Sequence, residues 1–150
     1  MEHDLRNWLW EFFPNLRFFN EPITDDSIIG VALINDDGPH WVAVYEESLV
    51  MTDLRNYFFN ENGDEDTSDE DALEWYNYNV LGSYIGKNTP VFMHDYSVGE
   101  CAASRFNKYY ETYIILDDTS SIEEAIDIIT EKDTMLYVPL EQVEQINNYS

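Results

Sequence analysis

The chain has 150 residues, of which 44% are hydrophobic, and its 31 acids against 7 bases give a net charge of -24. This length and apolar content are expected to bury one core, so residues 1–150 are interpreted as a single domain. The charge excludes a general basic groove for nucleic acid, because such a negative field repels phosphates. No apolar run approaches the length of about 18 residues that spans a bilayer, and the acidic N-terminus does not resemble a signal peptide, so we expect an intracellular protein and no membrane partner.

Two interpretations of the acidity remain open. In the first, the acids form a well-solvated surface that keeps the protein from associating. In the second, the acidity is the function, and the protein imitates DNA in order to occupy a basic groove of a nucleic acid enzyme.

The N-terminal part of the chain predicts one helix and one buried strand. Apolar residues recur at helical spacing over residues 3–13, and Pro14 ends the pattern. Residues 27–34 form a nearly continuous apolar run rich in β-branched side chains, which is typical of a strand buried on both faces. We therefore place this strand at the centre of a sheet.

A β-hairpin is predicted next, with strands at 41–45 and 49–51 and a polar turn at 46–48. His40 lies at the mouth of the first strand, and Asp53 follows the second. Because paired antiparallel strands bring such positions to one end of a sheet, the carboxylate of Asp53 is expected to reach the imidazole of His40 and to fix its tautomer.

The stretch 60–71 contains neither a base nor an apolar residue and is predicted to be a solvated acidic loop. It does not match a calcium loop, because the glycine at the sixth position and the glutamate at the twelfth are missing. The sequence therefore predicts no metal and no cofactor. Helical spacing resumes over 72–84, and a short strand is predicted at 89–93.

The single cysteine, Cys101, is predicted to open a helix that presents an apolar face as far as Tyr113. A cysteine in the first turn meets the positive end of the helix dipole, which stabilises its thiolate. Further along, we expect a helix over 122–131 capped by Ser120 or Ser121, an edge strand over 135–138 and a helical turn over 140–146.

The order of His40, Asp53 and Cys101 in these contexts resembles that of the adenovirus-type and SUMO-specific cysteine proteases. The resemblance extends to the buried strand before residue 35 and to the run of Gly38, His40 and Trp41 that opens the next strand, and it covers about residues 1–116. It implies an α+β fold with a papain-like core, in which a central mixed sheet packs against the helix that carries the nucleophile. Residues 117–150 would add a C-terminal helix and an edge strand.

The resemblance also implies a mechanism. Cys101 attacks a peptide carbonyl, His40 protonates the leaving amine and Asp53 holds His40. His94 stands where the family has a glutamine, and its ring N–H can donate to the oxyanion in the same way. The implied function is a viral endopeptidase that cleaves virion precursor proteins, in the host cytoplasm or in the virion, with a protein or peptide substrate.

Other interpretations compete with the protease. His40, Asp53 and Cys101 can all be structural residues. From a different class, the chain can be an acidic inhibitor, encoded by a phage or mobile element, that binds a basic groove on a restriction, repair or CRISPR enzyme. A degenerate protease scaffold reused as a binding module would satisfy both hypotheses.

Overall fold

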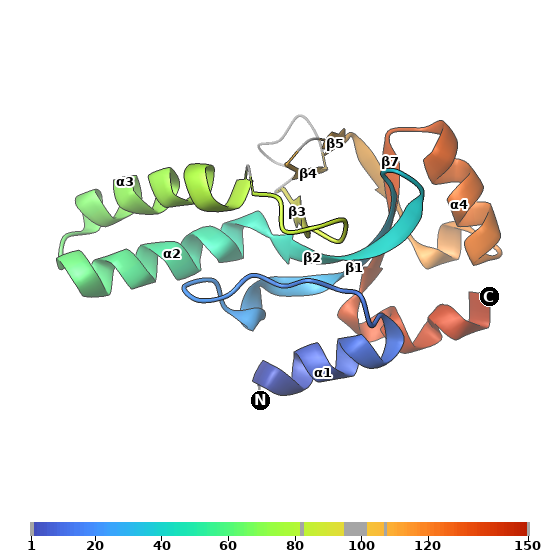
Figure 1. Cartoon of the computed structure of the whole chain (residues 1–150), viewed down its shortest axis with the longest axis horizontal. Helices are drawn as coiled ribbons and strands as arrows, with labels where there is room; N and C mark the ends of the chain where they lie inside the picture. The colour runs from blue at the N-terminus through green and yellow to red at the C-terminus, as the bar shows by residue number, and fades with distance from the viewer. Residues whose placement is uncertain (1, 82, 95–101, 107, 150) are drawn as a thin grey trace.

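A computed structural model describes residues 2–81, 83–94, 102–106 and 108–149 and shows an α+β fold built on a mixed sheet (Figure 1). Within these residues the sheet has seven strands, which are β1 (Ile28–Asn35), β2 (Pro39–Glu46), β3 (Val91–Met93), β4 (Ala103–Arg105), β5 (Lys108–Tyr110), β6 (Thr112–Ile114) and β7 (Thr134–Pro139). Their order across the sheet is β5-β4-β3-β2-β1-β7-β6. Neighbours are antiparallel except for the pairs β2–β3 and β6–β7, which are parallel.

The helices lie between these strands and at the N-terminus and C-terminus of the described chain. The α-helices are α1 (Glu2–Phe12), α2 (Glu47–Asn62), α3 (Glu65–Tyr76) and α4 (Ile122–Glu131). Short helical segments are η1 (Asp25–Ser27), the π-helix η2 (Asn77–Leu81), η3 (Leu116–Asp118) and η4 (Leu140–Tyr149). The predicted helices over 3–13 and 122–131, the strands over 27–34 and 89–93 and the terminal helical turn are confirmed.

Strand β1 lies inside the sheet and is buried on both faces, as its sequence predicts. Val31 and Leu33 contribute to the larger apolar cluster, while Ala32 and Ile34 contribute to the smaller one on the opposite face. The prediction that β7 is an edge strand is wrong, because β7 pairs with β1 on one side and with β6 on the other. An apolar run as short as 135–138 has the same pattern in an edge strand as in an inner strand, so the sequence near it does not indicate its position in the sheet.

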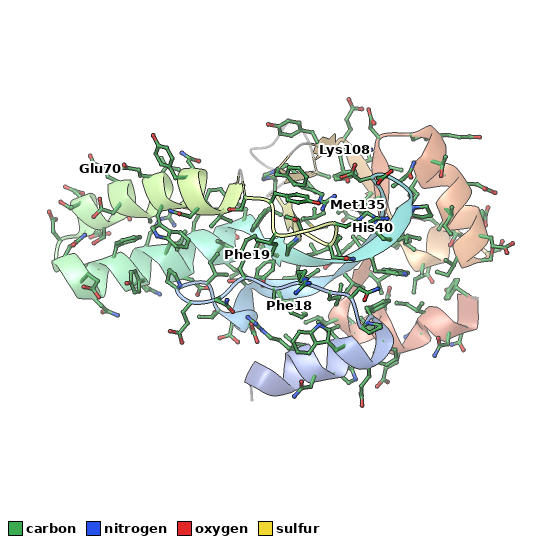
Figure 2. All side chains as sticks on the ribbon, viewed as in Figure 1. Phe18, Phe19, His40, Glu70, Lys108 and Met135 are labelled. Atoms are coloured by element: carbon green, nitrogen blue, oxygen red, sulfur yellow. The ribbon has the colours of Figure 1, made fainter. Side chains whose placement is uncertain are left out.

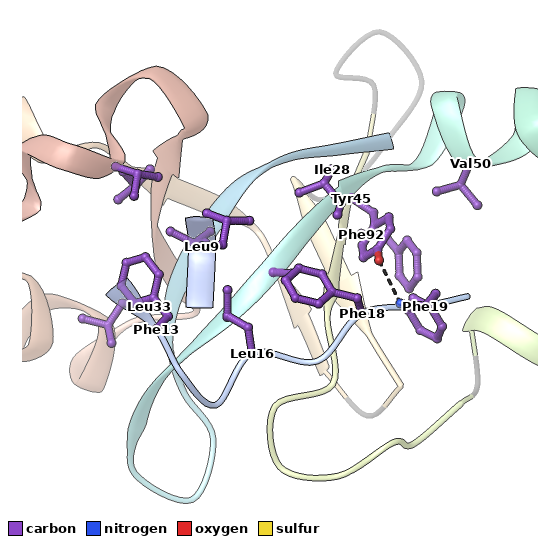
Figure 3. Close-up of a cluster of buried hydrophobic side chains, with 14 of the residues drawn as sticks. Leu9, Phe13, Leu16, Phe18, Phe19, Ile28, Leu33, Tyr45, Val50 and Phe92 are labelled. Carbon is purple, nitrogen blue, oxygen red and sulfur yellow. Dashed lines mark hydrogen bonds between the residues drawn. The ribbon is translucent and has the colours of Figure 1, made fainter. Parts of the chain in front are cut away.

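The larger apolar cluster includes Tyr45 on β2 (Figure 3). The Tyr45 ring packs against Phe19 and Phe92, and its hydroxyl accepts a hydrogen bond of 2.8 Å from the backbone N–H of Phe19. Burial raises the pKa of Tyr45 far above its usual range. This one hydroxyl therefore satisfies a buried backbone donor and joins the loop after α1 to the centre of the sheet.

The predicted β-hairpin is wrong, because residues 49–51 belong to helix α2. Val50 and Leu54 are fully buried one helical turn apart, so the apolar run serves a helix face and not a strand. The strand that pairs with β2 in place of the predicted one is β3, about forty residues further along the chain. A three-residue apolar run is too short to separate the two periods.

The acidic stretch 60–71 is also not a loop. Helix α2 ends at Gly63, whose φ of 70° is left-handed and whose N–H donates to the carbonyl of Phe59. Asp64 then caps α3 by accepting from the N–H of Asp66. Acids in the first turn of α3 also meet the positive end of its dipole, so these charges favour a helix at this position.

The predicted helix over 101–113 is wrong as far as the structure describes it. Residues 103–105, 108–110 and 112–114 form β4, β5 and β6. Tyr109, Tyr110, Thr112 and Tyr113 have high strand propensity, and their pairing with neighbouring strands outweighs the helical spacing of the aromatic rings. Cys101 itself lies outside the described residues.

Helices α2 and α3 pack side by side and project from the sheet as a hairpin (Figure 1). We call residues 47–76 the helical arm. None of the helices in the described ranges is long and apolar enough to cross a membrane.

Gly30 offers a test of how tightly β1 is packed against β7. A Cβ at this position would clash with the carbonyl oxygen of Val138 and lie 2.9 Å from the Tyr137 ring. We expect Gly30→Ala to lower the free energy of unfolding by about 2–3 kcal/mol, as overpacking does. Urea titration followed by circular dichroism measures this value.

The matched control is Gly63→Asn, because a Cβ there meets no atom within 4 Å and Asn tolerates left-handed backbone. It is expected to cost less than about 1 kcal/mol. Equal losses for the two variants would show that Gly30 is not constrained by close packing.

Candidate functional site

His40 lies at the start of β2, and both of its ring nitrogens contact backbone carbonyls. Nδ1 is 3.0 Å from the oxygen of Gly38, and Nε2 is 2.8 Å from the oxygen of Lys87. Carbonyl oxygens only accept, so a neutral imidazole satisfies one of these contacts and an imidazolium satisfies both. His40 also lines a cavity of about 310 Å³ beside the loop that follows α1. In this geometry its nitrogens hold two loops together, and among the described residues their partners are carbonyl oxygens and not a carboxylate.

Asp53 lies on α2, and its Oδ2 atom accepts three hydrogen bonds from the turn before β1. The donors are the backbone N–H of Thr24 at 2.9 Å, the hydroxyl of Thr24 at 3.0 Å and the hydroxyl of Ser27 at 2.6 Å. The structure therefore gives Asp53 and His40 different partners, and the expected contact between them is absent from the described geometry. Asp53 instead fixes the short helix η1 to the arm.

His94, which was predicted to donate to an oxyanion, links the arm to the sheet. Its Nδ1 is 3.1 Å from Oε2 of Glu47, at the start of α2, and its Nε2 is 2.8 Å from the hydroxyl of Ser104 on β4. The same Glu47 oxygen accepts a hydrogen bond of 2.8 Å from the hydroxyl of Tyr76, at the end of α3. We call Glu47, Tyr76, His94 and Ser104 the root cluster.

The contacts of the root cluster define which atom of His94 donates to Glu47. Because a carboxylate only accepts, Nδ1 of His94 carries the hydrogen that faces Glu47, and Nε2 contacts a hydroxyl that can either donate or accept. The hydrogen bond from His94 lowers the pKa of Glu47, and the hydrogen bond from Tyr76 adds to this. Burial raises the pKa of Tyr76, and the adjacent Glu47 charge raises it further.

An acid, a histidine and a hydroxyl in series is also the connectivity of a catalytic relay. Here Ser104 is only 1% exposed and sits in β4 between β3 and β5, so its hydroxyl does not face a substrate. The cluster therefore has a structural role, because its polar contacts hold the arm to the sheet. Glu47 and Ser104 were missed by the sequence analysis, since nothing in the chain near them signals contact with residue 94.

The arm concentrates negative charge on a helical scaffold. It carries ten acids and a single base, Arg55, so it supplies nine of the 24 net negative charges of the chain. The acids are Glu47, Asp53, Glu61, Asp64, Glu65, Asp66, Asp69, Glu70, Asp71 and Glu74. Arg55 lies 3.5 Å from Asp69, and Glu70 lies on α3 away from the sheet (Figure 2).

The arm and the turn after it also expose large apolar side chains. Tyr57 and Phe59 on α2, Leu73 on α3 and Tyr78 on η2 are all exposed, and Tyr78 reaches 79%. Exposed aromatic rings next to charges are characteristic of binding surfaces. A signal for them was present in the sequence, because Tyr57 and Phe59 directly precede the acidic stretch.

No group of three or more His, Cys, Asp or Glu side chains in the described part of the chain has a geometry that holds a metal ion. Comparison with protein-family models, with curated proteins and with solved structures finds no match for the chain. Function is therefore inferred from the charge, exposure and contacts of the described residues. These residues offer two features, the root cluster and the acidic arm.

Replacing Glu47 tests the root cluster. Glu47→Gln keeps the shape of the side chain but removes the charge that accepts from His94 and Tyr76. We expect it to lower the free energy of unfolding at pH 7 by about 1 kcal/mol, a value reduced by solvent because the side chain is partly exposed. Chemical denaturation at several pH values measures the effect.

The pH dependence has a defined sign. Because folding lowers the pKa of Glu47 from 4.5, its stabilisation is fully present above that value and is lost as the pH falls through the lower folded pKa. The gap between wild type and Glu47→Gln should therefore shrink below pH 4.5. Glu61→Gln removes an equal charge from the other end of α2, where it meets the negative end of the helix dipole, so it should leave stability at pH 7 unchanged or raise it slightly. A cost equal to that of Glu47→Gln would count against the root cluster.

Asp53 gives a second test. Asp53→Ala leaves the N–H of Thr24 and the hydroxyl of Ser27 without their acceptor, so we expect a loss of about 2 kcal/mol in the free energy of unfolding. Asp26→Ala, at an exposed acid of the same turn, is the matched control and should change stability by less than about 0.5 kcal/mol. Thermal unfolding that shows no difference between the two proteins would contradict this role.

Proposed function

We propose that this chain is an acidic binding protein whose helical arm docks in a basic groove of a nucleic acid enzyme. The observation that carries the proposal is the placement of ten acids and one base on a projecting helical hairpin. A groove built for nucleic acid presents Lys and Arg side chains along its length, and a rod of carboxylates is complementary to it.

The fold supports docking in two ways. The acids lie on helices, so they do not have to be ordered when the partner binds, which lowers the entropic cost of association. The exposed rings of Tyr57, Phe59 and Tyr78 supply apolar contact that electrostatic attraction by itself does not provide. Charge then governs the rate and orientation of encounter, while the rings contribute to residence time.

The viral cysteine protease and its papain-like core remain a prediction from the sequence. Cys101 lies outside the described residues, so its distance from His40 is not part of the described geometry. The contacts of His40 and Asp53 favour the binding protein over the enzyme, because each residue has structural partners that the catalytic scheme does not use. If binding is the function, Cys101→Ala should bind the partner as well as the wild type does.

The test uses a panel of purified nucleic acid enzymes with basic grooves, comprising a restriction endonuclease, a DNA repair enzyme and a CRISPR nuclease. The wild-type chain is expected to bind at least one of them, to compete with duplex DNA for it and to bind more weakly as salt rises. Replacing Glu61, Glu65 and Glu70 with Gln should weaken this binding about tenfold, because three exposed charge pairs are lost.

The control removes the same charge elsewhere, at Glu123, Asp127 and Glu131 on the exposed side of α4. This variant should keep nearly wild-type affinity. Equal weakening by both variants would show that only net charge matters and that the arm is not the docking surface. Failure of the wild-type chain to compete with DNA on every enzyme of the panel would reject the proposal.

A further inference from the structure

An open cavity lies where the arm meets η2, at the junction of α3 and η2. Its volume is about 380 Å³, and its lining comprises Phe58, Asp71, Glu74, Trp75, Tyr78 and Asn79. Phe58 comes from α2, and the other five come from successive turns of α3 and the π-helix that continues it. We call this cavity the arm pocket.

The walls of the arm pocket combine aromatic rings with negative charge. Three rings line it, and Tyr78 stands 79% exposed at its side. Asp71 and Glu74 are one helical turn apart and therefore lie on neighbouring positions of one helix face. Among the described residues that line the cavity, none is basic.

One carboxylate in the pocket is already oriented. Oδ2 of Asp71 accepts a hydrogen bond of 2.7 Å from the side-chain amide of Asn62. Phe58 and Trp75 each pack one side against the apolar core, which limits the positions of their rings. The site is therefore largely formed before any ligand binds, and this lowers the cost of binding.

The geometry points to the arm pocket as a receptor for one arginine side chain of the docked enzyme. This inference rests on the function proposed above and names the contact that would give it specificity. A guanidinium is planar, stacks on aromatic rings and donates paired hydrogen bonds to carboxylates, so it uses both kinds of wall at once. The volume lies near the lower end of the range for ligand pockets, about 300–1,000 Å³, which suits a single side chain.

Charge complementarity also selects this occupant over others. An apolar side chain would leave the carboxylates of Asp71 and Glu74 partly desolvated and unpaired. A lysine ammonium satisfies the charge but is more strongly hydrated and offers no plane to stack, so it should bind more weakly than arginine. A nucleic acid base edge would bring phosphates close to an arm with nine net negative charges.

The test titrates the full chain with a capped Gly-Gly-Arg-Gly-Gly peptide and follows the indole N–H signals by NMR. The Trp75 signal, assigned with a Trp75→Phe protein, should shift, whereas those of Trp8, Trp10 and Trp41 should not, because they lie on α1 and β2. The matching citrulline peptide keeps the shape but not the charge and should give no shift. The lysine peptide should bind more weakly than the arginine peptide.

Variants then separate the walls of the pocket. Tyr78→Leu should lower the affinity for the arginine peptide about threefold to tenfold. Tyr78→Phe should keep the wild-type affinity, since the ring and not the hydroxyl makes the contact. The high exposure of Tyr78 means that these variants are expected to fold. Glu74→Gln should also lower the affinity for the arginine peptide. An unmoved Trp75 signal, an equal shift with citrulline or an unchanged affinity in Tyr78→Leu would each overturn the arginine site.

This result is separable from the test of docking. If the variant with Gln at positions 61, 65 and 70 loses enzyme binding while the Trp75 signal does not shift with the arginine peptide, the pocket inference is wrong and docking stands. If the peptide shifts the Trp75 signal as expected but the chain does not compete with DNA for any enzyme of the panel, the arginine site is supported and the proposed function fails.

Discussion

The parallel pairing of β2 with β3 is the constraint on which the rest of the structure depends. Antiparallel neighbours can be joined by a tight turn, but parallel neighbours need a connection that returns the chain to the starting end of the sheet. Residues 47–90 provide this connection, and most of it is the hairpin of α2 and α3. The arm is therefore part of a connection that the parallel pairing requires, and this connection extends away from the sheet. It also carries the segment with the densest charge in the chain.

The root cluster determines how this extension is held. Glu47, at the start of α2, contacts Tyr76 at the end of α3 and His94 directly after β3, so a single carboxylate joins the two helices of the arm to the sheet. A partly buried polar network of this kind specifies one geometry, because any displacement leaves a donor or acceptor unpaired. The histidine that looked like a catalytic candidate in the sequence is thus explained by positioning, and so is Asp53, which holds η1 to the side of α2.

Part of the negative charge on the arm is placed where helix electrostatics favour it. Asp64, Glu65 and Asp66 stand at the N-terminus of α3, where the dipole and the cap stabilise negative charge. Exposed acids such as Glu61, Glu70 and Glu74 repel their neighbours across solvent, where screening is strong. Neutralisation of such a surface by a basic partner relieves this repulsion and lowers the free energy. The repulsion therefore favours association with cations and opposes self-association.

The sequence by itself determined the elements whose pattern is long and local: the strand at residues 27–34, the helix at 122–131 and the acidic character of the chain. It did not determine elements whose pattern is short. The run at 49–51 and the aromatic residues after position 101 fit both the helical and the strand period. Burial of a helix face decided the first, and strand pairing decided the second. His40, Asp53 and His94 were singled out from the sequence as catalytic residues, whereas the partners that the structure gives them are Lys87, Ser27 and Glu47, each supplied by another part of the fold. Tertiary structure alone decided them, because side-chain contacts across many residues depend on where the backbone places each element and not on spacing along the chain.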